Sequence, residues 1–240
     1  MCSLRAHPCL NLPLLSPITF SHPKFKNAPS SLRPSMTGNR LHGPITKALS
    51  FIEEFPPNAL HRVRDPQWRG GFSLGVDLGL SRTGLALSKG YSVRPLTVLN
   101  LRGQKLELRL LEIAEKEEVD EFIIGLPKSC DGEETPQSNK VRSVAGRLAI
   151  RAAERGWRVY LQDEHGTSAE AADRVIYMGL SKSARQTRTD AYAAVIVLER
   201  YFSTSGQATE IVFPKQMELQ EKLRKGAAKD IDFFPEEFEG

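Results

Sequence analysis

Two short apolar runs joined by a tight turn begin the regular part of the pattern. Phe72–Leu78 and residues 83–88 are mostly apolar, and Gly79 and Gly84 bracket the turn between them. Glycine allows the backbone angles that a tight turn requires, so the stretch predicts an antiparallel hairpin. Residues 94–100 are expected to add a third strand, which indicates an antiparallel half-sheet.

Helical and strand patterns alternate after the third strand. Apolar residues three and four positions apart predict an amphipathic helix over 104–118, and the unbroken apolar run 122–126 is typical of a strand buried on both faces. Thr135 as N-cap and Pro136 after it predict the start of a second helix. A strand over 157–162 is expected to follow.

The rest of the patterned region is expected to be helical. Thr167 and Glu170 have the spacing of a capping box, which predicts a third helix. Residues 180–188 indicate a basic loop, and residues 190–202 predict the last helix. The order predicts an α/β fold with a mixed five-stranded sheet, in which three antiparallel strands precede parallel additions and helices cover both faces.

The net charge of +4 on the 240 residues is concentrated at the N-terminus. Six of the 33 basic side chains and two of the 29 acidic ones lie in residues 1–60, which leaves 27 of each sign in the remainder. Contacts with nucleic acid are therefore expected from a local basic patch and not from a generally basic domain. No apolar run approaches the roughly 18 residues of a transmembrane helix, so no membrane partner is expected.

The N-terminal composition indicates a targeting segment. Residues 1–50 contain no acidic side chain and are rich in Ser, Pro and Leu, which is typical of an organellar transit peptide. The high Ser content favours the chloroplast stroma over the mitochondrion, and a disordered tail is the alternative. Residues 51–71 are expected to be a linker, 72–203 the folded domain and 204–240 a C-terminal tail that ends acidic.

Three carboxylates fall at the expected ends of elements. Asp77 is near the end of the first strand, Glu164 (or Asp163) follows the last strand, and Asp190 starts the last helix. These positions converge at one edge if the first strand is central. Clustered carboxylates repel one another unless divalent cations neutralise them, and hard oxygen ligands suit Mg²⁺ or Mn²⁺. Two such ions can hold a scissile phosphate, activate a water and stabilise the leaving oxygen.

Four cations are expected to position backbone phosphates beside these acids, and they are Arg82, Lys128, Arg185 and Arg188. The candidate acids also have purely structural readings, and Arg82 and Lys128 are ordinary surface charges by default. Asp77 can bond to its own turn, Asp190 can complete a helix cap, and the Asp163–Glu164 pair can be a solvated turn.

Four blocks resemble the YqgF (RuvX-like) family, in the order of that family. They are Gly75-Val-Asp-Leu-Gly79 with Ser81-Arg-Thr-Gly84, Phe122-Ile-Ile-Gly-Leu-Pro127 with Asp131-Gly132 and Pro136-Gln137, Leu161-Gln-Asp-Glu164 with Thr167 and Glu170-Ala171, and Asp190-Ala-Tyr-Ala-Ala194 with Leu198 and Tyr201-Phe202. The resemblance covers residues 72–203 and implies an RNase H-like fold and a metal-dependent nuclease. It also implies that Asp77, Glu164 and Asp190 are the catalytic, metal-binding acids. The sequence departs from the family pattern at His165-Gly166, where an Arg usually follows the acidic pair.

Family members are described as nucleases that trim the 5′ end of pre-16S ribosomal RNA. The resemblance therefore implies a nuclease that acts on structured precursor rRNA with Mg²⁺ or Mn²⁺, with ribosomal particles among its partners, and the N-terminal composition favours the plastid as its compartment. A Holliday junction resolvase-like DNA endonuclease and a noncatalytic RNA-binding module with a decayed site are the alternatives. The Asp-Leu-Gly hairpin also fits an actin-like ATPase or sugar kinase, but such enzymes need two copies of the fold and this chain has room for one.

Overall fold

A computed structural model describes residues 54–68, 70–90 and 92–226, so the expected transit peptide lies outside the described residues. In chain order the elements are α2 (Asn58–Arg64), β1 (Phe72–Leu78), β2 (Thr83–Lys89), β3 (Ser92–Leu99), α3 (Gly103–Lys116), β4 (Val119–Leu126), α4 (Pro136–Ala153), β5 (Arg158–Asp163), α5 (Thr167–Tyr177), α6 (Lys182–Ser203), β6 (Thr209–Ile211) and α7 (Met217–Lys225). None of the described helices is long and apolar enough to cross a membrane.

The strands form one mixed sheet in the order β3-β2-β1-β4-β5-β6. β2 is antiparallel to both β1 and β3, whereas β4 is parallel to β1 and β5 is parallel to β4. This confirms the mixed, RNase H-like sheet and places β1 in its interior. The sheet has six strands where five were expected, because β6 pairs antiparallel with β5 in the segment predicted to be a tail.

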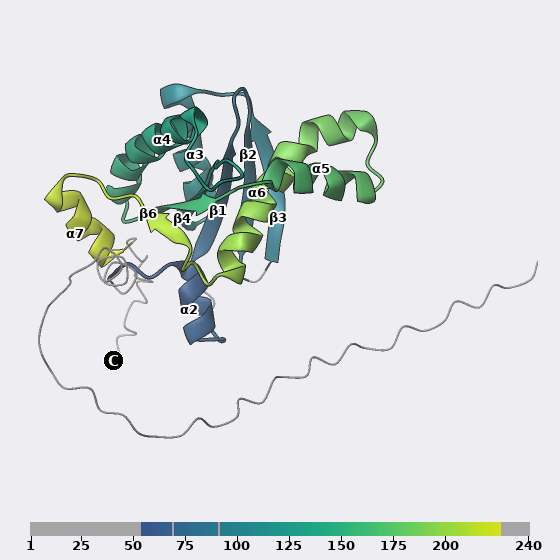
Figure 1. Ribbon diagram of the computed structural model, residues 1–240. Helices are drawn as coiled ribbons and strands as arrows, with labels where there is room; N and C mark the ends of the chain where they lie inside the picture. Colours follow the sequence, from purple (N-terminus) through teal and green to yellow (C-terminus); the bar gives the residue numbers. More distant parts are fainter. Residues whose placement is uncertain (1–53, 69, 91, 227–240) are drawn as a thin grey trace, which may run out of the picture. The chain divides into compact units, whose positions relative to one another are not determined.

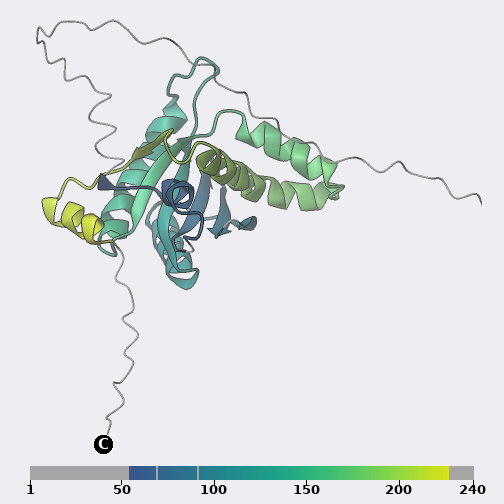
Figure 2. The same ribbon diagram turned by 90° about the horizontal axis from the view of Figure 1, so that it is seen from below.

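Helices cover both faces of the sheet, as expected (Figures 1 and 2). Successive side chains of a strand point to opposite faces. Leu74 and Val76 of β1 therefore pack with α3 and α4 on one face. On the other face, Ala86 of β2 and Ile123 of β4 pack against α6. Asp77 follows Val76, so it points to the α6 face.

The segment expected to be a linker contains α2, which is fixed to the sheet through a buried carboxyl group. Glu121 of β4 accepts hydrogen bonds from Ser73 Oγ at 2.6 Å, from the Tyr201 hydroxyl at 2.6 Å and from the Asn58 backbone N–H at 3.0 Å. The Tyr201 oxygen in turn accepts a bond from the Ala59 N–H at 3.0 Å. Because Glu121 is fully buried, these bonds offset the cost of removing it from water.

Arg158 of β5 adds a second link to the same segment. Its guanidinium donates to Asn58 Oδ1 at 2.9 Å and to Asp120 Oδ2 at 2.8 Å. α7 closes this end of the fold, where Leu223 packs with Phe55. Chain segments on both sides of the predicted domain are therefore parts of one folded unit.

Two helix starts differ from the predictions. α6 begins at Lys182, about two turns before the expected start, because the Ser181 side chain accepts a hydrogen bond from the Ala184 N–H at 3.3 Å. The predicted basic loop is therefore wrong, and Arg185 and Arg188 lie on a helix. The N-cap of α5 is Gly166 and not a Thr167 capping box. The predicted cap at Thr135, with Pro136 after it, is confirmed.

Candidate active site

Glycines on the α6 face of the sheet make room for the acidic groups. A Cβ atom on Gly84 would lie 1.9 Å from the Asp190 backbone oxygen, and one on Gly125 would lie 1.8 Å from Glu164 Oε2. Both distances are far below van der Waals contact. Only glycine therefore lets the α6 backbone rest on β2 and lets the Glu164 carboxylate lie against β4.

The three candidate acids come from separate elements at one end of the sheet. Asp77 is paired in register with Gly84, the residue against which the backbone of Asp190 rests. Glu164 directly follows β5, and its N–H donates to the Leu126 carbonyl at the end of β4, at 3.2 Å. Asp190 was predicted at the start of the last helix, but it lies in the third turn of α6.

Electrostatic effects link the three carboxylates. Burial, reinforced by the nearby Asp190 charge, raises the pKa of Asp77 from 3.8 to about 7. Burial also raises the pKa of Glu164 from 4.5 to about 8, with further repulsion from Asp77 and Asp163. The charge of Asp190 thus repels that of Asp77, and the charge of Asp77 repels that of Glu164. A bound cation would neutralise this repulsion.

Arg82 holds Asp190 in the described conformation. Its Nε lies 2.7 Å from Asp190 Oδ2, and its Nη2 lies 3.5 Å from Oδ1. Among the described residues, no three His, Cys, Asp or Glu side chains come close enough together to hold a metal ion as they stand. A shared ion would therefore require Asp190 to exchange Arg82 for the ion.

The donor set fits a hard divalent cation. All three side chains offer carboxylate oxygens, the ligands that Mg²⁺ and Mn²⁺ prefer. Glu164 Oε2 is buried and has no hydrogen-bond partner in the described part of the chain. A buried acceptor without a donor is costly, and a cation would satisfy it.

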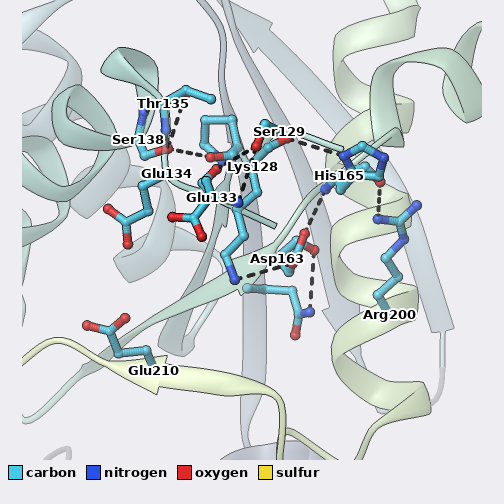
Figure 3. A network of polar contacts seen from close by, with 12 residues as sticks. Lys128, Ser129, Glu133, Glu134, Thr135, Ser138, Asp163, His165, Arg200 and Glu210 are labelled. Atoms are coloured by element: carbon cyan, nitrogen blue, oxygen red, sulfur yellow. Dashed lines mark hydrogen bonds and ion pairs between the residues drawn. The ribbon is translucent and has the colours of Figure 1, made fainter. Parts of the chain in front are cut away.

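Asp163 belongs to a polar network that includes Lys128 and His165 (Figure 3). Its contacts there distinguish it from Glu164, a choice that the sequence alone left open. Lys128 Nζ lies 3.4 Å from Asp163 Oδ2, and the Lys128 carbonyl lies 3.2 Å from His165 Nδ1. Arg200 of α6 donates to the His165 carbonyl at 2.6 Å. Asp163 is thus paired with Lys128, whereas Glu164 is half-buried near Asp77.

The four predicted phosphate-binding cations do not form one patch. Arg82 and Arg188 line a cleft of about 610 Å³ between α6 and the edge strand β3. Arg188 is exposed and Arg185 is half-buried, one turn earlier on the same helix. Lys128 lies apart from them, beside Asp163.

Sequence reasoning assigned no role to two residues that shape the site. Gln137 Nε2 donates to the Leu78 carbonyl at 3.0 Å, next to Asp77. Arg200 contributes a positive charge that lowers the pKa of Glu164 against the larger effect of burial. The place of Gln137 in the second block of the family resemblance was an available signal for it, whereas Arg200 has no distinguishing local pattern.

Comparison with known proteins identifies the family. The model of a family described as "RuvX: Holliday junction resolvase" matches residues 71–204, which is more than half of the chain. The chain belongs to the RuvX family. This confirms the family resemblance and assigns the chain to a nuclease family, and the match spans all three candidate acids.

Relatives in the RuvX family are covered almost completely by this chain. A protein of Nocardioides named "Putative pre-16S rRNA nuclease" is 35% identical over 142 residues, which is 57% of this chain and 90% of the relative. A protein of Anaeromyxobacter dehalogenans with the same name is 36% identical over 130 residues, 53% of this chain and 93% of the relative. Among solved structures, Thermus thermophilus RuvC in complex with a Holliday junction matches 60% of this chain and 100% of its own, at 18% identity and a TM-score of 0.40.

Proposed function

We propose that this RuvX chain is a nuclease that uses Mg²⁺ or Mn²⁺ to hydrolyse phosphodiester bonds in structured RNA. Its proposed substrate is the 5′ region of pre-16S ribosomal RNA in the plastid, free or within ribosomal particles. One observation carries the proposal: Asp77, Glu164 and Asp190 come from three segments yet are linked through their charges. The names of the relatives supply the substrate, and the composition of residues 1–50 supplies the compartment.

Asp77, Glu164 and Asp190 would hold the metal. A pair of divalent ions supplies the positive charge that activates a water and stabilises the leaving oxygen. Arg82 is paired with Asp190 in the described conformation, so it is placed to move onto a substrate phosphate when Asp190 turns to a cation. Arg188, across the same cleft, would hold the next phosphate of the strand.

The test compares Asp77→Asn with the matched variant Asp173→Asn on the full chain. Asp173 is an exposed residue of α5 with the same side chain. With Mg²⁺ present, the unaltered chain and Asp173→Asn are expected to shorten a precursor rRNA, and Asp77→Asn is expected to lose cleavage while its far-ultraviolet circular dichroism is unchanged. EDTA is expected to stop all cleavage. Undiminished cleavage by Asp77→Asn would refute the assignment.

A second candidate function is Holliday junction resolution, because the matching family model is described by that activity. The same proteins are therefore assayed on a four-way DNA junction. Preferential cleavage of the junction would replace RNA as the substrate while leaving the role of Asp77 intact. RNA binding without turnover would identify the noncatalytic module instead.

A further inference from the structure

A helical hairpin projects beyond the sheet and exposes an apolar tip. It consists of α5 and the first half of α6, which extend past β3 in both views (Figures 1 and 2). Ile176, Tyr177 and Met178 are 55%, 94% and 50% exposed at its end. They are three of the seven large hydrophobic side chains that are exposed in the described part of the chain. Three such side chains in succession on a projecting element mark a contact surface.

α5 is joined to the second half of α6, the half that packs on the sheet, and these contacts place the tip relative to the acids. Ala171 of α5 packs with Ala193 and Ile196 of α6. Both terminal nitrogens of the Arg174 guanidinium donate to the two Glu199 oxygens at 2.8 Å. Asp190 is on the α6 half of this hairpin, so the tip and a candidate acid belong to the same pair of packed helices.

Basic side chains predominate around the tip, although exposed Asp173 lies one turn before Tyr177. Residues 174–189 contain Arg174, Lys182, Arg185 and Arg188 and no acidic side chain. Arg174 is paired with Glu199, which leaves the three basic residues of α6 to lead from the tip toward Asp190. Two copies of this tip would repel each other, whereas a polyanion would be attracted. An aromatic ring beside a row of cations is the arrangement that binds single-stranded nucleic acid, by stacking bases and holding phosphates.

We propose that the α5–α6 tip binds an unpaired stretch of the RNA substrate, with a base stacked on Tyr177 and phosphates held by Lys182 and Arg185. This inference rests on the proposed function. Lys182 and Asp190 are separated by about 12 Å along α6, since each helical residue adds about 1.5 Å. About three to four stacked nucleotides span that length, at about 3.4 Å each. The contact therefore sets the distance between the phosphate held by Lys182 and the cleaved bond.

The test measures binding of a single-stranded oligoribonucleotide to the full chain in EDTA, so that no cleavage is needed. Loss of one stacked base is expected to weaken binding by about 5- to 150-fold in Tyr177→Ala. Tyr177→Phe keeps the stacking ring and is expected to bind within about twofold of the unaltered chain. The matched control is Met217→Ala, because Met217 is a 69% exposed side chain on α7, and its binding is expected to be unchanged.

Several results would overturn the inference. Unchanged RNA affinity of Tyr177→Ala, or equal losses in Tyr177→Ala and Met217→Ala, would exclude a stacked base at the tip. A change in sedimentation of Tyr177→Ala without a change in RNA affinity would identify the tip as a contact between copies of this chain. Failure of the nuclease proposal is seen separately, because a chain that binds RNA through Tyr177 but never cleaves it refutes only the catalytic assignment.

Discussion

The close contact between α6 and β2 yields a specific prediction for Gly84→Ala. The added Cβ would lie 1.9 Å from the Asp190 carbonyl oxygen, 2.2 Å from its carbonyl carbon and 2.9 Å from the Ala191 nitrogen. All three atoms belong to the helix backbone, so no side chain can rotate to relieve the clash. The whole of α6 must move away from the sheet by roughly 1 Å or more to restore ordinary contact.

The cost of this movement follows from the packing around it. Overpacking a close-packed core costs about 1–3 kcal/mol, and a backbone neighbour places Gly84→Ala at the upper end of that range. The same movement displaces Asp190 from Asp77. Misplacement of a catalytic group by about 1 Å costs on the order of a hundredfold in rate. We therefore expect a lower free energy of unfolding together with a loss of cleavage.

Gly146→Ala is the matched control, because a Cβ at Gly146 of α4 meets no other atom within 4 Å. Alanine is favoured over glycine inside a helix by about 1 kcal/mol, so this variant is expected to be as stable as the unaltered chain or more stable. Urea denaturation of both variants measures the difference. A Gly84→Ala protein as stable and as active as Gly146→Ala would show that α6 does not rest on β2 as described.

Three further variants separate stability from chemistry. Gly125→Ala places a Cβ where Glu164 Oε2 lies. Because the end of the Glu164 side chain can rotate away, the free energy of unfolding should change by less than about 1 kcal/mol. The displaced carboxylate should lower cleavage about a hundredfold. Arg82→Ala removes the cation that competes for Asp190. Because a half-exposed ion pair contributes about 1 kcal/mol at most, calorimetry should detect Mn²⁺ binding that is up to about fivefold tighter. Weaker Mn²⁺ binding would contradict the exchange of Arg82 for the ion. Burial raises the pKa of Glu121 above its ordinary 4.5, so the native state binds this proton more tightly than the unfolded state and loses stability as the pH rises above 4.5. Glu121→Gln cannot titrate, and its free energy of unfolding should decline less between pH 4.5 and pH 7 than that of the unaltered chain.

Local patterns predicted the hairpin that carries Asp77 and the start of α4. The Phe72–Leu78 run and the turn glycines specify the hairpin, and the Thr135 cap specifies the start of α4, because each depends on neighbours in sequence. β6 was missed because a three-residue strand gains its stability from β5 and has no periodic pattern of its own. The start of α6 was missed because residues 182–189 are mostly polar and read as a loop, whereas in the fold Ser181 caps a helix that includes them.

The sequence predicted the three acids of the site but not the side chains that pair with them. The position of Asp77, Glu164 and Asp190 near one sheet end follows from the element order, since parallel strands end at the same edge. The pairing of Arg82 with Asp190 and of Lys128 with Asp163 depends on side-chain positions that no spacing encodes. The hydrogen bond from the Asn58 N–H to Glu121 could not be predicted either, because the two residues are 63 positions apart in the sequence.

A crystal structure of the full chain grown with Mn²⁺, with anomalous diffraction recorded from the metal, tests the shared site most directly. We predict an anomalous peak surrounded by carboxylate oxygens of Asp77, Glu164 and Asp190, with Arg82 turned away from Asp190. A Mn²⁺ peak elsewhere, or an intact Arg82–Asp190 pair in crystals saturated with the ion, would contradict it.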